Sequence, residues 1–229
     1  MEQLHNGFTL QLCPGAFPLS TDSMALAHFA RLPKQAKVLD LGAGCGTLGL
    51  LLCAKDPVCQ VTGLELDENA HAMALENAKR NGIEDRFTSI CGDIRNAEAL
   101  IAPGSFSVCI SNPPYFTGGP ESTRTPQARK DDTCPTDALM AAAARSLKFG
   151  GDFFLVHKPE KLGQLIAGAG AQGLEAKRLC LLRHKEGAQV SLVLVQFRKG
   201  AKPGLIWEEV CLQDAAGQPT DYYRAVYHC

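Results

Sequence analysis

Four consecutive residues, Asn112-Pro113-Pro114-Tyr115, combine groups that could bind a planar amine with two N–H donors. The carboxamide oxygen of Asn112 and the carbonyl oxygen of Pro113 are two acceptors, and the proline rings hold them close together in a stiff turn. Tyr115 adds a flat face on which a ring can stack. This combination indicates chemistry on an amino group attached to a ring or an amide.

The same residues could also form an ordinary proline turn beside a core aromatic residue, so the elements around them decide the interpretation. The apolar run 106–110 comes just before the turn and predicts a buried strand. The turn would then lie at the carboxyl end of a strand, which is where open α/β sheets bind their ligands.

A second motif follows an earlier predicted strand, residues 37–41. The glycine-rich segment Gly42-Ala43-Gly44-Cys45-Gly46 comes directly after this strand, and the apolar segment 48–55 predicts a helix. A strand, a glycine-rich turn and a helix are typical of nucleotide binding, because glycines let a ligand approach closely and the helix N–H groups face it.

Three successive predicted strands carry an acidic residue at or next to their carboxyl ends. These residues are Asp40 in 37–41, Glu65 after 60–64 and Asp93 after 86–91. Because the carboxyl ends of parallel strands meet at one edge of a sheet, the three carboxylates should line the same edge as the Asn112 turn. The position of Glu65 suits the hydroxyl groups of a ribose.

The rest of the chain continues the alternation of strands and helices. We expect a helix over 24–31 capped by residues 21–23, a loop over 117–135, a helix over 136–148, and strands over 152–157, 177–182 and 189–197. The last two strands must be antiparallel, because the turn between them is short. The pattern predicts an α/β fold whose seven-stranded sheet is mostly parallel, with one antiparallel strand and helices on both faces.

We expect one domain of three parts: an N-terminal lead-in and helix over 1–36, a core over 37–199 and a tail over 200–229. The net charge of −1 argues against a protein that coats nucleic acid through its overall charge. Residues 1–115 carry 8 basic and 12 acidic side chains, or −4, whereas residues 116–229 carry 15 and 12, or +3. Any phosphate contacts should therefore lie in the second half.

The ten cysteines and six histidines show neither C-x-x-C nor H-x-x-x-H spacing, so we expect reduced thiols and no metal site. The first residues lack a basic targeting region, and the longest apolar run, residues 48–54, is too short to span a bilayer. These features predict a cytoplasmic protein with no membrane partner. The sequence leaves the oligomeric state open, with a monomer favoured.

A dinucleotide-dependent dehydrogenase is one alternative, because Gly44 to Gly49 match G-x-G-x-x-G and Glu65 follows about 20 residues later. In that fingerprint the first glycine makes the tight turn after the strand, whereas here Gly42 already does so. The dehydrogenase alternative also gives no role to Asp93 or to the Asn112 turn.

Taken together, the glycine-rich turn, the three acidic segments and the NPPY sequence resemble the motif series of class I S-adenosylmethionine-dependent methyltransferases, which have a Rossmann-like fold. In that family, NPPY marks methylation of planar amino groups. Further segments are similar to the bacterial tRNA(Val) adenine-N6-methyltransferase family, which modifies the adenosine beside the anticodon: residues 15–23, 115–116, 157–160 and 202–204.

This resemblance implies a role for each candidate residue. S-adenosylmethionine would be bound by Asp40, Gly42, Gly44, Gly46, Glu65, Leu66, Asp93, Ile94 and Thr21. Asn112, Pro113, Pro114 and Tyr115 would be catalytic. The candidates for tRNA contact are Phe116 and, because the second half is more basic, Arg124, Arg129, Lys130 and Lys158, although residues 129–131 depart from the pattern of the family. Glu65 would take the ribose hydroxyls, Asp93 the adenine amine of the cofactor, and Leu66 with Ile94 the faces of its ring.

Other substrates and roles stay open from the sequence. A protein glutamine N5-methyltransferase also acts on a planar amine and resembles this chain through NPPY, although its members tend to carry a longer N-terminal module than the 36 residues before the first strand allow. An rRNA or DNA amino methyltransferase would use the same motif. The intact acidic and NPPY positions weigh against a non-catalytic RNA-binding module.

Overall fold

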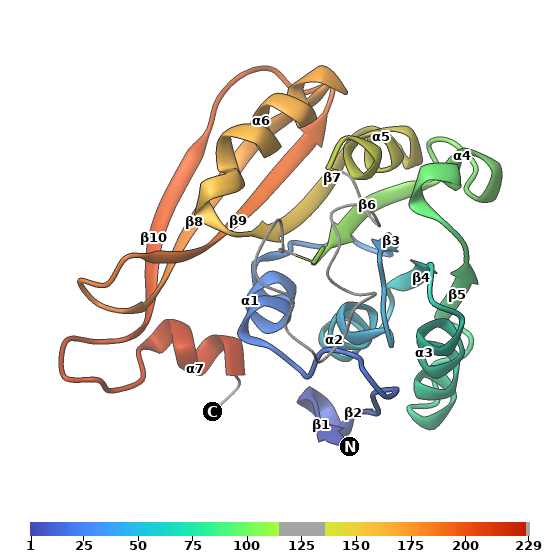
Figure 1. Cartoon of the computed structure of the whole chain (residues 1–229), viewed down its shortest axis with the longest axis horizontal. Helices are drawn as coiled ribbons and strands as arrows, with labels where there is room; N and C mark the ends of the chain where they lie inside the picture. The colour runs from blue at the N-terminus through green and yellow to red at the C-terminus, as the bar shows by residue number, and fades with distance from the viewer. Residues whose placement is uncertain (115–135, 228–229) are drawn as a thin grey trace.

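The computed structural model describes residues 1–114 and 136–227. Its centre is an eight-stranded sheet with the order β10-β8-β9-β7-β6-β3-β4-β5 (Figure 1). The strands are β3 Lys37–Leu41, β4 Gln60–Glu65, β5 Phe87–Cys91, β6 Phe106–Ser111, β7 Leu147–His157, β8 Leu174–Lys185, β9 Val190–Lys199 and β10 Ile206–Gln213. In the N-terminal lead-in, β1 (Glu2–Gln3) and β2 (Thr9–Leu10) form a separate antiparallel pair.

Neighbouring strands of the large sheet run parallel except at β9, which is antiparallel to both β7 and β8. The chain passes from β3 to β4 and β5 on one side, and then returns to place β6 and β7 on the other side of β3. The strand order therefore reverses beside β3. In open α/β sheets, ligands bind at the carboxyl ends of the strands at such a reversal.

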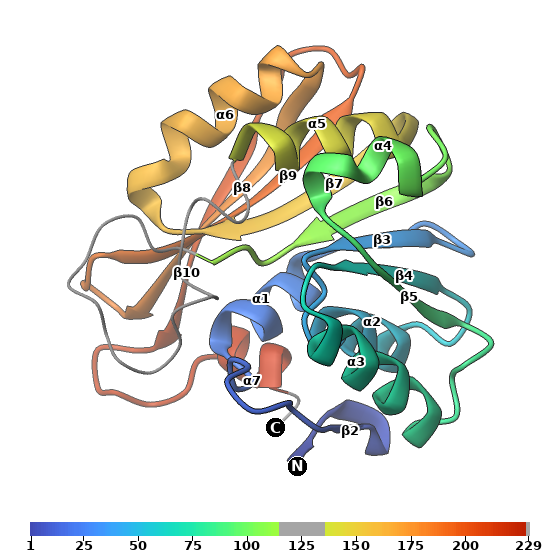
Figure 2. The ribbon, with the colours of Figure 1, turned by 45° about the vertical axis from the view of Figure 1, so that its right-hand side comes forward.

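Helices cover both faces of the sheet (Figure 1 and Figure 2). One face carries α1 Thr21–Phe29, α2 Thr47–Lys55, α3 Glu68–Arg80 and α7 Asp221–Tyr227, and the other carries α4 Ala97–Leu100, α5 Thr136–Ser146 and α6 Leu162–Ala171. Short 3-10 turns cover His5–Gly7 (η1), Ile94–Asn96 (η2) and Pro159–Lys161 (η4).

Each face of the sheet contributes to its own hydrophobic cluster, because successive side chains of a strand point to opposite faces. In β7, Phe154 and Val156 pack with the helices α1 to α3, whereas Phe153 and Leu155 pack with α5 and α6. Strands buried on both faces need apolar residues at nearly every position. This requirement explains the continuous apolar runs that predicted the central strands.

The seven predicted strands, the antiparallel strand and the helices on both faces are confirmed, but the expected number of strands is wrong by one. The eighth strand, β10, forms in the tail and pairs in parallel with β8. It is an edge strand, and its first four residues, 206–209, are exposed. Arg178 and Arg183 of β8 pair across to Glu208 and Glu209 of β10, at 3.4 and 3.0 Å.

Two predicted boundaries also differ. Helix α1 begins at Thr21, because Ser20 and not the segment 21–23 is its N-cap; the Ser20 side chain accepts from the backbone N–H of Ser23 at 3.4 Å. Strand β7 begins at Leu147, immediately after α5, so the glycines at 150–151 lie inside a strand and do not separate the two elements.

Candidate active site

The Asn112 turn follows β6 at the edge of the sheet where the strand order reverses. Ser111, the last residue of β6, is fully buried, and its Oγ donates to the carbonyl oxygen of Leu41 in β3 at 2.7 Å. The Nδ2 of Asn112 donates to the Oγ of Ser23 on α1 at 3.0 Å. The amide nitrogen of Asn112 therefore faces α1, and the amide oxygen points to the other side.

The glycine-rich turn between β3 and α2 has a backbone that favours glycine. Gly42, Gly44 and Gly46 have φ angles of 77°, 55° and 85°. A Cβ on Gly46 would lie 3.0 Å from the ring of Phe87, so packing of α2 also requires glycine there. A Cβ on Gly42 or Gly44 would meet nothing within 4 Å, which leaves this backbone open to a ligand.

Asp40 lies in β3 between β4 and β6 and is fully buried. Neither of its carboxyl oxygens has a hydrogen-bond partner of normal geometry. Burial raises the pKa of Asp40 to about 7, the nearby charge of Glu65 adds to the rise, and the backbone N–H of Gly49 in α2 offsets part of it. A buried carboxyl group without a partner is costly, and a cationic ligand would lower that cost.

Glu65, the last residue of β4, is already engaged by the backbone around it. Its Oε2 accepts from the N–H of Gly44 in the glycine-rich turn at 2.7 Å, and its Oε1 accepts from the N–H of Asp67 at 2.8 Å. A ribose bound at this carboxylate would therefore replace or share internal hydrogen bonds.

Asp93 follows β5 and caps the short turn η2, because its side chain accepts from the backbone N–H of Arg95. The Nε of Arg95 also donates to both carboxylate oxygens, at 3.0 and 2.8 Å. These hydrogen bonds hold the pKa of Asp93 below its usual value. Of the two apolar residues predicted to enclose a ring beside it, Leu66 is 48% exposed and Ile94 only 9%.

Thr21 opens α1 on the same side of the sheet as the glycine-rich turn. Its Oγ1 lies 2.6 Å from the hydroxyl of Tyr227, so it ties α1 to the C-terminal helix α7. Ser23, the partner of Asn112, was not among the predicted site residues. The contact joins residues 89 positions apart, and the sequence holds no local pattern that signals it.

Lys158 follows the carboxyl end of β7, the strand next to β6, and its backbone N–H donates to the Nδ1 of His157 at 2.8 Å. This places Lys158 at the same sheet edge as the Asn112 turn. The other predicted catalytic or substrate residues lie outside the described part of the chain: Tyr115, Phe116, Arg124, Arg129 and Lys130.

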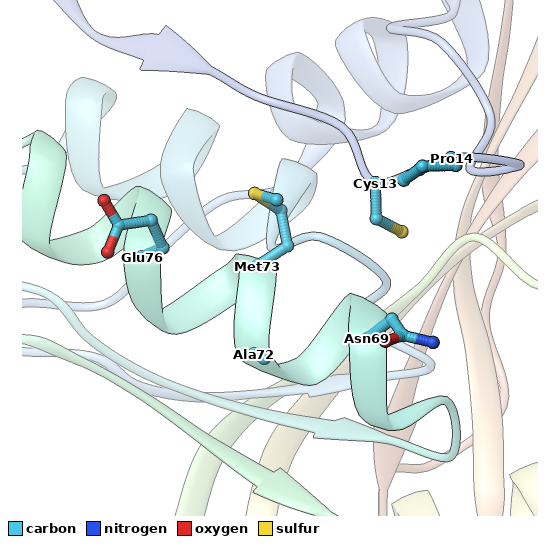
Figure 3. A pocket seen from close by; sticks show the side chains of 6 residues that line it. All are labelled: Cys13, Pro14, Asn69, Ala72, Met73 and Glu76. Carbon is cyan, nitrogen blue, oxygen red and sulfur yellow. The ribbon is translucent and has the colours of Figure 1, made fainter.

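A hollow of about 540 Å³ lies between the N-terminal segment and α3. Figure 3 shows Asn69, Ala72, Met73 and Glu76 on α3 and Cys13 and Pro14 on the segment that faces them. The described residues that line this hollow include none of those predicted for the site. It adjoins the glycine-rich turn through Cys13, whose N–H donates to the Sγ of Cys45 at 3.4 Å.

Among residues 1–114 and 136–227, no three His, Cys, Asp or Glu side chains are grouped so that they could hold a metal ion. Within these same ranges, no helix combines the length and apolar character needed to cross a membrane.

Two relatives are named tRNA1(Val) (adenine(37)-N6)-methyltransferase. The protein from Photobacterium profundum is 30% identical over 86% of this chain and 84% of its own length. The protein from Tolumonas auensis is 33% identical over 87% of this chain and 83% of its own length. Each relative therefore matches this chain over most of both lengths.

A crystal structure described as a predicted O-methyltransferase from Agrobacterium tumefaciens matches with a TM-score of 0.76 at 20% identity, covering 91% of this chain and 96% of that one. This likeness confirms the Rossmann-like fold. The model of the methyltransferase small domain family matches residues 19–166 of the 229. The dehydrogenase alternative is thereby rejected, and the chain belongs to the methyltransferase small domain family.

Proposed function

We propose that this protein transfers a methyl group from S-adenosylmethionine to the N6 amine of an adenine in tRNA, at the adenosine beside the anticodon. The observation that carries the proposal is the position of the Asn112 turn. Its amide oxygen points away from α1, at the sheet edge that also holds the glycine-rich turn and the carboxylates of Asp40 and Glu65.

The residues at this edge fit the cofactor. The backbone at Gly42 and Gly44 is open where a ligand would approach. The Asp40 carboxyl group, whose oxygens have no hydrogen-bond partner of normal geometry, suits the cationic amino group of a methionine moiety. Glu65 would accept from the ribose hydroxyls and Asp93 from the adenine amine. When bound, S-adenosylmethionine supplies an electrophilic methyl group on a sulfonium.

Asn112 and Pro113 would prepare the nucleophile. The amine of adenine is a poor nucleophile, because its lone pair is delocalised into the ring. The Asn112 side-chain oxygen and the Pro113 carbonyl oxygen would accept hydrogen bonds from its two N–H groups. These bonds would favour a pyramidal nitrogen whose lone pair faces the methyl group. The transfer would leave S-adenosylhomocysteine and a cationic nitrogen, which would then lose one proton to water, so no separate general base is needed in this arrangement.

The target base must leave its stack before it can reach Asn112, at a cost of a few kcal/mol. Tyr115 and Phe116 would offer stacking faces, and one base stacked on an aromatic side chain is worth about 1–3 kcal/mol.

The basic residues of the second half would contact phosphates of the tRNA. They are Lys158, at the carboxyl end of β7, and Arg124, Arg129 and Lys130. The names of the relatives and the more basic second half of the chain support tRNA over a protein amide. A tRNA substrate would fit the cytoplasmic location and the monomer expected from the sequence.

The test is to incubate the protein with S-adenosylmethionine labelled in its methyl group, and separately with total tRNA, rRNA, DNA and protein extract. Label should enter tRNA and be recovered as N6-methyladenosine after nuclease digestion. A tRNA1(Val) transcript with adenine at position 37 should accept the label, and the matched transcript with guanine there should not. Label in protein or rRNA, with none in tRNA, would contradict the proposal.

A further inference from the structure

A hydrogen bond links helix α1 to the Asn112 turn, across 89 positions of the chain. Ser23 lies in the first part of α1 and is only 7% exposed. Its Oγ accepts from the Nδ2 of Asn112 at 3.0 Å. The contact therefore acts on the side chain whose oxygen the proposed reaction requires.

The orientation of Asn112 matters because the two ends of a carboxamide have opposite hydrogen-bonding character. The oxygen accepts, whereas the nitrogen donates two hydrogens. The last torsion of an asparagine side chain is broad and roughly two-fold, so both orientations lie within reach unless a neighbour selects one. With the nitrogen turned toward the target amine, a donor would face a donor and the amine would not be held.

Ser23 belongs to an element that is held at both ends. Near the start of α1, the Oγ1 of Thr21 lies 2.6 Å from the hydroxyl of Tyr227 on α7. At the other end, the ring of Phe29 packs edge to face against Phe154 of β7, with ring centroids 6.0 Å apart. Because α1 is held at both ends, the Ser23 hydroxyl keeps its position, and it can therefore fix the orientation of the Asn112 side chain.

We propose that Ser23 is a positioning residue for methyl transfer: its hydroxyl holds the amide nitrogen of Asn112, so that the amide oxygen faces the target amine. This inference rests on the proposed function, since only a reaction at an amine needs that acceptor. Ser23 acts through Asn112 and does not itself touch the substrate. It removes the unproductive orientation before the substrate arrives, which is a form of preorganisation.

Single-turnover methyl transfer to the tRNA1(Val) transcript, at saturating cofactor and tRNA, tests the inference. Ser23→Ala should slow the transfer by about threefold to tenfold, the effect of one lost hydrogen bond. The Kd for S-adenosylmethionine and the KM for tRNA should not change. Ser23→Thr keeps the hydroxyl and should recover most of the rate.

Ser107→Ala is the matched control. Ser107 lies on β6, at the end away from Asn112, and its Oγ donates to the carbonyl oxygen of Lys37 at 3.2 Å. Its removal should leave the rate unchanged. In an Asn112→Ala background, Ser23→Ala should cause no further loss, because there is no longer an amide to orient.

A second measurement detects the contact without any substrate. In protein labelled with 15N asparagine, the side-chain signals of Asn112 are identified by their absence from Asn112→Ala. These signals should shift and exchange faster with water in Ser23→Ala, and should not change in Ser107→Ala. Signals that do not respond to Ser23→Ala would show that the contact does not form, and would overturn the inference.

The outcomes separate the two proposals. If the wild-type protein methylates tRNA and folded Ser23→Ala does so at the same rate, the inference about Ser23 is wrong and the proposed function stands. An equal loss from Ser23→Ala in both backgrounds leads to the same conclusion, because Ser23 would then not act through Asn112. If the wild-type protein methylates no tRNA, the proposed function fails first, and the positioning role fails with it.

Discussion

The Asn112 turn and the strand ends that carry Asp40, Glu65 and Asp93, called here the acidic edge, lie at one edge of the sheet but differ in how their polar groups are bound. At the turn, the amide nitrogen of Asn112 is bound by Ser23 and the strand end is fixed by the hydrogen bond from Ser111 to Leu41, so the protein sets the orientation of this amide before any ligand binds. At the acidic edge, Glu65 and Asp93 are satisfied by groups of the protein itself.

This difference has an energetic consequence. A preformed acceptor needs no reorganisation when the substrate arrives, so its contribution goes into the rate. A carboxylate that must first give up an internal hydrogen bond contributes less to binding. Its contribution is the free energy of the new hydrogen bond to the ligand minus that of the internal hydrogen bond that is lost. We therefore expect substitutions at the turn to affect the rate of transfer, and substitutions at the acidic edge to affect cofactor affinity by smaller factors.

The largest expected effect is that of Asn112→Ala. It removes an acceptor that is needed chiefly in the transition state, so the single-turnover rate should fall by about 10²–10³ at saturating cofactor. The Kd for the cofactor, measured by calorimetry, should stay near the wild-type value. Asn69→Ala is the control, since Asn69 lines the hollow beside α3 and should not affect the rate. A folded Asn112→Ala protein with a near wild-type rate would show that the turn has only a structural role.

The next effect is that of Glu65→Ala on cofactor affinity. Charge-assisted hydrogen bonds to the ribose are worth about 1.5–3 kcal/mol, and the exchange with Gly44 should place the observed loss toward the lower value. Calorimetry should show a weaker Kd, with an unchanged single-turnover rate once the cofactor is saturating. Glu76→Ala, which removes a half-exposed carboxylate of α3, is the matched control. A loss of rate with an unchanged Kd would contradict the division between the turn and the acidic edge.

Asp40 should make cofactor binding depend on pH. Its pKa is raised from 3.8 to about 7, so the carboxyl group is mostly neutral at pH 6 and mostly charged at pH 8. The cationic amino group of the cofactor is attracted only by the charged form. Affinity should therefore rise with pH, by about tenfold between pH 6 and pH 8. Asp40→Asn should remove this dependence, and an unchanged pH profile in Asp40→Asn would contradict the role of Asp40.

The stability of the unliganded protein provides an independent test of the raised pKa of Asp40. Because the folded state binds a proton more tightly than the unfolded state, the contribution of Asp40 to stability is full below about pH 4 and is lost as the pH rises through 7. Relative to Asp40→Asn, the wild-type free energy of unfolding should fall by roughly 3–4 kcal/mol across this window. Urea denaturation of both proteins at pH 4 and pH 8 measures the difference.

The central part of the fold was predictable because its strands are buried on both faces. Strands such as β3 and β6 show this as short apolar runs, and the motif residues follow directly at their carboxyl ends. The edge strand β10 was missed because its pairing depends on the exposed edge of β8, and its own residues are largely polar or exposed. Pattern alone does not report a strand that is stabilised mainly by its neighbour.

The same reasoning separates the predictable from the unpredictable part of the site. The strand ends place Asp40, Glu65, Asp93 and Asn112 on one edge, which the order of motifs along the chain already indicated. The partners of these side chains depend on contacts between distant segments. Neither the Ser23 hydroxyl on Asn112 nor the absence of a partner for the Asp40 oxygens can be read from residue spacing.

The smallest effect should come from the cation at the acidic edge. Arg95 donates to both oxygens of Asp93, so it competes with the adenine amine that Asp93 is proposed to accept from. The pair is largely exposed on the arginine side, and such pairs are worth about 0.2–1 kcal/mol. Arg95→Ala should therefore tighten cofactor binding, by up to about fivefold.

The dependence of cofactor affinity on ionic strength tests whether Arg95 competes for Asp93. Salt screens the attraction between Arg95 and Asp93. At high salt, Arg95 therefore competes less strongly with the adenine amine, even in the wild-type protein. The difference in Kd between wild type and Arg95→Ala should be largest at low salt and should shrink as salt is added. Arg80→Ala, which removes an exposed arginine paired with Glu76 on α3, should show no such trend. If Arg95→Ala instead weakens binding at low salt, Arg95 supports the cofactor site and does not compete for Asp93, and the acidic edge is closer to preformed than its hydrogen bonds indicate.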